Sequence, residues 1–216
     1  LVDLDFWQTN MVSEDSRIFW NALFLYDGDY ESIPLSYPVS MDANVASTFW
    51  QTAQNVYKQQ RRWAWGAENF PYIAYGFIKN KKIKFRTKVY YLVNTIEGYW
   101  SWSTNALMIF ALGWLPVMIG GRAFNETVLS YNLPIVTRTI MTFAMVGLVT
   151  SAIVSMQLLP PRPPQYSKWK TLSMVLQWVM VPFTIVIFGS FPAIDAQTRL
   201  MLGKYMGFWI TPKHRK

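Results

Sequence analysis

Three long stretches without a charged residue constrain the fold of this chain more than any other feature: Gly98–Gly121, Thr139–Pro161 and Thr171–Ile194. Each exceeds the ~20 residues that a helix needs to cross a hydrocarbon core of about 30 Å. None shows the polar stripe of a surface helix. Burial inside a large soluble protein is the alternative, but only 15% of the residues are charged, against about 25% in a soluble domain. The sequence therefore predicts three transmembrane helices, because too little polar chain remains to cover them.

Basic residues beside these stretches indicate their orientation. Lys79–Lys88 and Pro160–Lys170 are rich in Lys and Arg, and short loops of this kind stay on the cytoplasmic side. We therefore expect the first helix to lead out of the cytoplasm and the second to lead back. The tail from Arg199 is also basic, which conflicts with a third full crossing. Either one span is re-entrant, with a break at Pro182, or the tail does not follow the rule. Asp195–Ile210 has the composition of an amphipathic helix in the membrane interface.

Local patterns predict the elements before the first apolar stretch. Ser16–Leu25 is expected to form a helix, and Ala46–Trp65, which contains neither Gly nor Pro, a second and longer one. Asp27–Asp29 is typical of a turn. Tyr30–Val39 contains two prolines and is therefore expected to be an edge strand or an extended segment. Asp42 is interpreted as a helix cap.

The strongest chemical signal is the sequence Gln59-Gln60-Arg61-Arg62-Trp63, which has the form Q-x-x-R-W. On a helix, Gln59, Arg62 and Trp63 share one face. An arginine can hold a diphosphate with two hydrogen bonds and keeps its charge at any working pH. An indole can stack on a sugar ring, and the amide can bond sugar hydroxyls. The alternative is a basic, aromatic helix lying at the membrane interface.

A second signal is Ser13-Glu14-Asp15, just before the first predicted helix. A carboxylate near a helix N-terminus is stabilised in its ionised form, which suits a general base that accepts a proton from a hydroxyl. By itself, the same sequence is more often an N-terminal cap.

Together these features resemble the processive membrane glycosyltransferases of family 2, such as cellulose and hyaluronan synthases. The shared order is an acidic pair ending in Asp15, a Q-x-x-R-W helix beginning 44 positions later at Gln59, a basic segment and several apolar helices. The resemblance covers about residues 10–65 by motif and the remainder by architecture. It implies a mostly α-helical chain that holds the C-terminal part of a GT-A-type α/β domain, followed by transmembrane and interfacial helices.

The resemblance also implies an activity: inverting transfer of a sugar from a nucleotide-sugar donor to a hydroxyl of a growing polysaccharide or a glycolipid. Asp15, with Glu14 beside it, would be the catalytic base. Gln59, Arg62 and Trp63 would bind the nucleotide diphosphate and the acceptor sugar. The protein would be a multi-pass protein of the cell membrane, with its catalytic side in the cytoplasm and the lipid bilayer as a partner.

The same comparison divides the chain into four expected parts. These are the end of the catalytic domain (1–75), a basic interfacial segment (76–100), three transmembrane helices (101–194), and an amphipathic interfacial helix with a basic tail (195–216). The chain begins at Leu1 without a signal-peptide pattern, and we expect further sequence before it. That sequence would hold the donor-binding half, so residues 1–216 alone would be inactive.

A divalent metal ion, Mg²⁺ or Mn²⁺, is expected from the resemblance, with its D-x-D ligands outside this chain. Asp3-Leu4-Asp5 and Asp27-Gly28-Asp29 match D-x-D by letters, but they lie too near Asp15 and in the wrong order. The chain has no cysteine and a single histidine, His214, which excludes a thiolate metal site and leaves that histidine as a solvated residue of the tail.

Two other functions stay open. A channel or transporter usually places polar or ionisable residues within its spans, and the three charge-free stretches hold no ionisable acid or base. A non-catalytic membrane anchor or assembly protein would make the two motifs incidental. Nucleic acid is a poor candidate as a partner, because the basic segment directly precedes the predicted membrane helices. Lys79–Lys88 would instead hold anionic lipid headgroups or only orient the chain. Trp65, Glu68 and Asn69 would line the acceptor site or pack the end of the second helix.

Overall fold

The structure, a computed structural model, describes residues 1–37, 39, 44–159 and 168–210. Helices account for most of these residues, and no β-strand occurs among them. The prediction of a mostly α-helical chain is confirmed. The chain divides into two compact units: residues 1–103 with 188–216, and residues 104–187. Asp42 and His214 lie outside the described residues.

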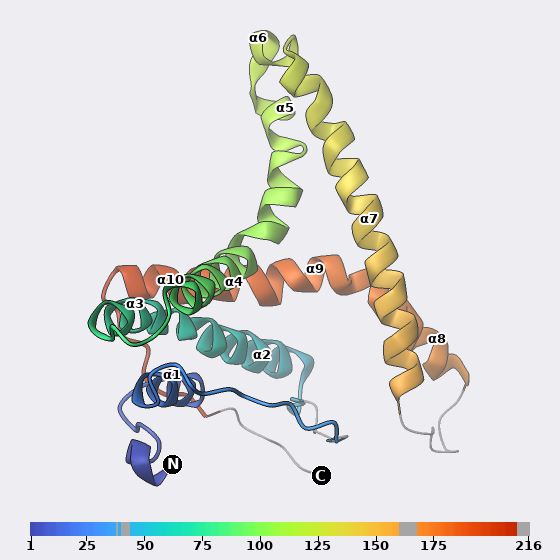
Figure 1. The fold of residues 1–216 in the computed structure, drawn as a ribbon. Helices are drawn as coiled ribbons and strands as arrows, with labels where there is room; N and C mark the ends of the chain where they lie inside the picture. The colour runs from blue at the N-terminus through green and yellow to red at the C-terminus, as the bar shows by residue number, and fades with distance from the viewer. Residues whose placement is uncertain (38, 40–43, 160–167, 211–216) are drawn as a thin grey trace. The chain divides into compact units, whose positions relative to one another are not determined.

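Unit 1 contains the first helices and the last one (Figure 1). After a short 3-10 turn, η1 (Val2–Leu4), come α1 (Glu14–Leu25), α2 (Phe49–Ala64), the 3-10 turn η2 (Trp65–Glu68), α3 (Asn69–Lys79), the first part of α4 (Phe85–Leu112), and α10 (Phe191–Met201). The two helices predicted before the apolar stretches correspond to α1 and α2. The predicted turn at Asp27–Asp29 is present, with positive φ at Asp27 and Gly28. Tyr30–Tyr37 has no regular structure.

Two apolar clusters hold unit 1 together. In the first, the end of α2 packs against α10 through Ala64, Trp65, Ala193 and Ala196, all fully buried. These small alanines allow the two helices to approach closely. The second cluster joins α1, α3 and the turn before α4 through Leu23, Ile73, Phe77 and Ile83. Val12, just before α1, belongs to the first cluster, so the start of α1 and the end of α2, which carry most of the predicted site residues, are held together.

Unit 2 contains the end of α4 and the apolar helices that follow it. These are α5 (Leu115–Ile119), α6 (Gly121–Asn125), α7 (Val128–Leu158), α8 (Lys168–Leu176), the 3-10 turn η3 (Gln177–Met180), α9 (Val181–Ile185) and the π-helical segment η4 (Val186–Ser190), whose last residues belong to unit 1. Thr127 caps α7, because its side chain accepts a hydrogen bond from the backbone N–H of Ser130.

Among the described residues, two helical stretches are long and apolar enough to cross a membrane, Val128–Leu158 and Leu172–Met201. They overlap the second and third charge-free stretches and support the expectation of a membrane protein. Pro182 stands at the start of α9, directly after the 3-10 turn η3, so the helical path is irregular at the predicted break. The number of crossings and their orientation stay predictions.

The first charge-free stretch differs from the single long helix expected from its length. Helix α4 ends at Leu112 and α5 begins at Leu115. Gly113 lies between them, and a Cβ added there would come within 2.4 Å of the Thr137 hydroxyl oxygen on α7. The absence of a side chain at Gly113 therefore permits a close approach that a continuous apolar pattern does not reveal.

The final helix is also shorter than the amphipathic pattern of Asp195–Ile210 suggested. Helix α10 ends at Met201, and Lys204–Ile210 lies outside any helix. Gly203 and Gly207 both have positive φ, a conformation that glycine adopts at no steric cost and that ends helices.

Candidate functional site

A cavity of about 270 Å³ in unit 1 brings together most of the residues predicted to form a site. Glu14 and Asp15 from the start of α1, and Arg62 and Trp63 from the end of α2, line this cavity. The other lining residues are Val12, Ser13, Ser16 and Tyr99. An acidic pair, a guanidinium and an indole therefore surround one space, although 47 positions separate Asp15 from Arg62.

The orientation of α2 depends on the residue beside the motif's arginine. The Arg61 Nη1 atom lies 2.8 Å from Asp195 Oδ2 on α10, and Arg199 Nε lies 2.7 Å from the other oxygen of the same carboxylate. This pairing directs Arg61 toward α10. Arg62 and Trp63, next along the helix, lie at the cavity, and the Trp63 side chain is 47% exposed. Arg199 lies four positions after Asp195, so helical spacing could have predicted that pair, whereas no local pattern indicates Arg61 as the second partner.

Gln59 is placed apart from the cavity. It lies one helical turn before Arg62, and its Oε1 atom accepts a hydrogen bond of 3.4 Å from Asn44 Nδ2. It is absent from the residues that line the cavity. The structure therefore gathers Arg62 and Trp63 of the motif at the acidic pair, while Gln59 contacts the segment before α2.

Ser13 holds the start of α1 against the end of α2. Its backbone N–H and its hydroxyl both donate to Glu68 Oε1, at 3.2 and 2.5 Å. The other oxygen of Glu68 accepts a 2.9 Å hydrogen bond from Trp65 Nε1. Ser13 occupies the N-cap position of α1 but makes no capping hydrogen bond with its side chain. The alternative interpretation of Ser13-Glu14-Asp15 as an N-terminal cap therefore gains no support from the Ser13 side chain, whose hydroxyl donates to Glu68 instead.

Asn69 and Arg17 extend this network. Asn69 is buried, and its Nδ2 atom donates to the hydroxyls of Ser13 and Ser16 at 3.2 and 3.0 Å. Its Oδ1 atom accepts from Arg17 Nε at 2.5 Å, and the Arg17 guanidinium lies 3.8 Å from the centre of the Tyr72 ring. Burial lowers the pKa of Arg17. Glu68 and Asn69 thus act by positioning the acidic pair, and neither was identified in that role from the sequence.

Asp15 and Glu14 lie in the first turn of α1, where the helix dipole favours negative charge. Asp15 is exposed, and its Oδ1 atom accepts a 2.8 Å hydrogen bond from the backbone N–H of Ser16. The Oε2 atom of Glu14 is buried and has no hydrogen-bond partner among the described residues. A buried carboxylate oxygen without a donor is costly, so this atom is suited to a hydroxyl or amide donor of a ligand in the cavity.

Tyr99 forms the wall of the cavity that α4 contributes. Burial raises the pKa of Tyr99 to about 12, with a smaller contribution from the charges of Asp15 and Glu68. The phenol is therefore neutral and able to donate a hydrogen bond at any physiological pH. Gly66 allows its approach, since a Cβ added at Gly66 would lie 2.3 Å from the Tyr99 hydroxyl oxygen. Tyr99 was not identified as a site residue from the sequence.

A second and larger cavity, of about 560 Å³, shares Ser16 and Tyr99 with the first. Aromatic rings from α1 and α4 contribute much of its wall: Phe19, Trp20, Tyr90, Tyr91, Tyr99 and Trp102. Asn69, Asn94, Thr95 and Ser16 add amides and hydroxyls, and no charged residue lines it. Flat rings beside neutral hydrogen-bonding groups suit a neutral ligand with both apolar faces and hydroxyls, such as a carbohydrate.

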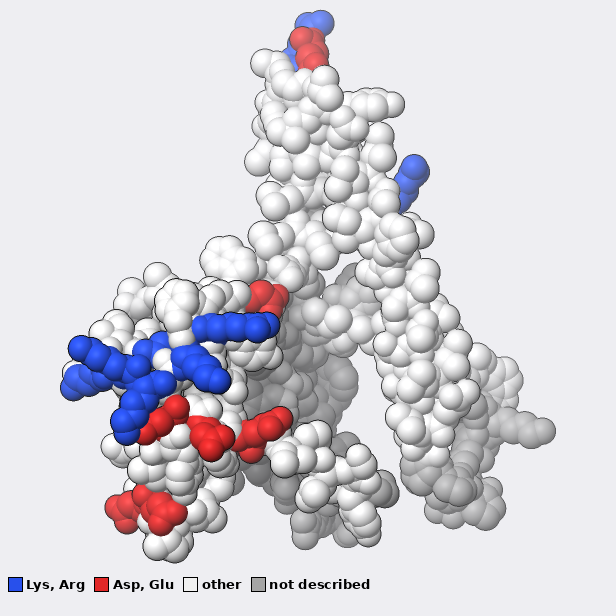
Figure 2. Space-filling view, in the orientation of Figure 1, with Lys and Arg blue, Asp and Glu red and all other residues white. Residues whose placement is uncertain are grey.

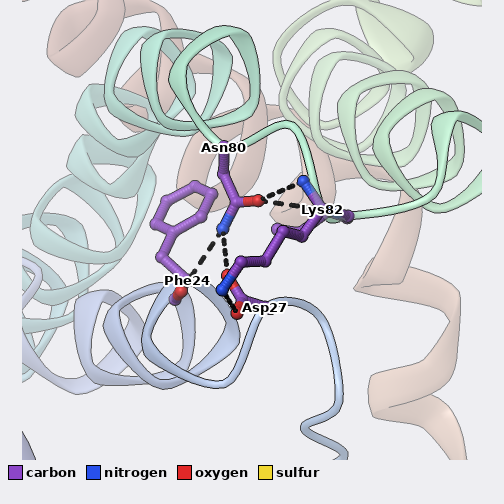
Figure 3. Close-up of polar contacts among 5 residues, drawn as sticks. Phe24, Asp27, Asn80 and Lys82 are labelled. Atoms are coloured by element: carbon purple, nitrogen blue, oxygen red, sulfur yellow. Dashed lines mark hydrogen bonds and ion pairs between the residues drawn. The ribbon is translucent and has the colours of Figure 1, made fainter.

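The described part of the chain offers no ligand set for a metal. No three acidic or histidine side chains within it come together closely enough to hold an ion. In each of the two D-x-D matches, one aspartate accepts side-chain hydrogen bonds from other residues of unit 1. Asp3 accepts a hydrogen bond from the Tyr26 hydroxyl, and Asp27 bonds to Asn80 and Lys82 (Figure 3). The divalent metal expected from the resemblance would take its D-x-D ligands from outside this chain, so it stays a prediction that these residues do not test.

Comparisons of this chain with protein-family models, with curated proteins and with solved structures find no match.

Proposed function

We propose that this chain forms the acceptor side of a membrane glycosyltransferase, which transfers a sugar from a nucleotide-sugar to a hydroxyl group. The observation that carries the proposal is the single cavity lined by Glu14, Asp15, Arg62 and Trp63. It combines a base, a cation suited to a diphosphate and an aromatic face suited to a sugar. With the exception of Gln59, these are the groups that the resemblance to family 2 glycosyltransferases selects from the sequence.

In the proposed reaction, the Asp15 carboxylate accepts the proton of the acceptor hydroxyl. The hydroxyl oxygen attacks the anomeric carbon of the donor from the side opposite the diphosphate, so the configuration at that carbon inverts. The bond from the anomeric carbon to the diphosphate oxygen breaks, and the nucleoside diphosphate leaves with the bonding electrons. Arg62 offsets the charge that develops on the diphosphate. Asp15 lies at the exposed edge of the cavity, which suits a base that must reach an incoming acceptor.

The aromatic cavity beside the site supplies room for the acceptor. It adjoins the first cavity at Ser16 and Tyr99, so a glycan bound along Trp20 and Tyr91 could present its terminal hydroxyl near Asp15. Tyr99 would donate a hydrogen bond to the sugar at the junction. Trp63, which also lines the first cavity, would stack on the sugar being transferred.

The test is release of nucleoside diphosphate by membranes that contain the full-length protein, across a panel of nucleotide-sugars. The Asp15→Asn variant keeps the geometry and removes the base, so release should fall about 10²- to 10⁴-fold. Asp29→Asn is the matched control, because Asp29 is exposed and does not line the cavity. Release with one donor that persists in Asp29→Asn and disappears in Asp15→Asn supports the proposal.

No release with any donor, from protein shown to be inserted in the membrane, would favour the non-catalytic anchor. Full release by Asp15→Asn would reject Asp15 as the base even if the protein is a transferase.

A further inference from the structure

The turn between α3 and α4 carries a dense group of basic side chains. Figure 2 shows Lys and Arg side chains gathered on one side of unit 1. Lys79–Lys88 holds six of the chain's 20 Lys and Arg residues. Three of these six have an evident role in the fold, and the other three do not. The three cations without a role in the fold are therefore available to a binding partner.

Lys82 and Lys88 stabilise the turn itself. Lys82 Nζ lies 2.7 Å from Asp27 Oδ2, and Asn80 Nδ2 donates to the other oxygen of Asp27 at 2.9 Å (Figure 3). The Lys88 ammonium donates to the backbone carbonyls of Phe77 and Asn80 at the end of α3. A cation at the C-terminus of a helix satisfies carbonyls that have no partner within the helix.

Lys79 and Ile83 complete the scaffold. The Lys79 ammonium lies 4.5 Å from the centre of the Tyr75 ring. Ile83 is 4% exposed and packs in the cluster with Leu23, Ile73 and Phe77. The turn is therefore anchored from within, and its outward side chains project from a backbone that is already ordered.

The side chains of Lys81, Lys84 and Arg86 are exposed, and none of the three makes a hydrogen bond or ion pair with another described residue. Between and beside them, two large apolar side chains also face outward: Ile78 is 76% exposed and Phe85 is 80% exposed. We call these five residues the basic-apolar patch. Like-charged cations held on an ordered turn repel one another, so the patch is more favourable next to an anionic partner.

We propose that the basic-apolar patch binds anionic phospholipid headgroups at the membrane surface, with Ile78 and Phe85 entering the boundary of the acyl chains. Cations beside exposed apolar side chains are the combination that interfacial segments use. Helix α4 begins within the patch, at Phe85, and leads into the first charge-free stretch. The described part of the chain also contains two helical stretches able to cross a membrane. A chain anchored in this way keeps the patch near a bilayer, so the bilayer surface is the anionic partner that it would meet. The inference does not depend on the proposed transferase activity.

The test uses the absence of cysteine from the chain. In an Ile78→Cys variant, a polarity-sensitive fluorophore reports whether position 78 enters the bilayer. The full chain is reconstituted in nanodiscs of phosphatidylcholine, with or without phosphatidylglycerol. We expect the emission to shift to the blue as the phosphatidylglycerol fraction rises, and the shift to decrease at high salt.

Replacing Lys81, Lys84 and Arg86 with Gln should weaken this response about fivefold per cation. The matched control replaces Lys58, Arg122 and Lys204 with Gln, which removes the same charge elsewhere and should preserve the response. Equal emission with and without phosphatidylglycerol would overturn the proposal, as would an equal loss in both triple variants. A shift produced by an acidic polypeptide or by DNA, without any response to phosphatidylglycerol, would instead identify the patch as a site for those polymers.

Discussion

Replacing Glu68 is the sharpest test of how the fold positions the acidic pair. Its carboxylate accepts hydrogen bonds from Ser13 N–H, Ser13 Oγ and Trp65 Nε1, and both donor residues are at most 5% exposed. In Glu68→Gln, one oxygen remains for the two Ser13 donors, but the new amide NH₂ faces the Trp65 N–H. One hydrogen bond to a charged acceptor is lost and one buried donor is left unpaired.

The expected cost of Glu68→Gln is about 2 kcal/mol, since a hydrogen bond to a charged group contributes roughly 1.5–3 kcal/mol. Glu68→Ala leaves all three donors without this acceptor, and its cost should be about 4 kcal/mol. In a chain of this length, about 2 kcal/mol corresponds to a decrease in Tm of roughly 4–8 °C.

The assay is thermal unfolding of the reconstituted protein, with Glu97→Gln as the control because Glu97 is exposed on α4. Exposed substitutions of this kind change stability by less than about 0.5 kcal/mol. Ser13→Ala should cost less in the Glu68→Ala background than alone, because the two residues share their hydrogen bonds. If the Tm of Glu68→Gln equals that of the unaltered protein and of Glu97→Gln, Glu68 does not hold the start of α1.

Three further predictions concern contacts elsewhere in unit 1. Gly66→Ala should destabilise the fold by about 1–3 kcal/mol, because the new Cβ overpacks against the Tyr99 hydroxyl. Adding Tyr99→Phe should relieve most of this cost, since the nearest remaining ring atom would lie 3.3 Å from the new Cβ. Calorimetric melts of the single and double variants measure this rescue. Asp195→Asn should lower the free energy of unfolding by about 2 kcal/mol, because Arg61 loses a partly buried partner. Glu126→Gln, which removes an exposed ion pair with Arg122, should change the free energy of unfolding by less than about 0.5 kcal/mol. Thermal melts of both variants measure the difference. The hydrogen bond from Lys82 lowers the pKa of Asp27, so this pair stabilises the fold above the unfolded-state pKa of the carboxyl, and that contribution is lost as the pH falls through the lowered pKa. The difference in Tm between the unaltered protein and Asp27→Asn should therefore be present at neutral pH and vanish in acid; a difference that is constant with pH would show that the ion pair is not its cause.

Much of the fold follows from patterns within short segments. The charge-free stretches predict apolar helices, and the runs without Gly or Pro predict α1 and α2, because the period of a helix is a local property. The acidic pair and Q-x-x-R-W could likewise be found from residue types and spacing. The break at Gly113 could not, because glycine within an apolar run is compatible with a helix, and only the close approach of Thr137 shows why the chain turns there.

By itself, the sequence determined which residues can share a helix face, where the apolar helices lie, and which residues are chemically suited to a site. Only the tertiary structure decided which face meets which neighbour. Arg61 and Arg62 are adjacent and of the same type, yet Arg61 pairs with Asp195, 134 positions away, while Arg62 lines the cavity. Glu68 similarly reaches Ser13 across 55 positions. Local periodicity cannot assign such partners, because they depend on how the buried alanines and Trp65 allow α2 and α10 to pack.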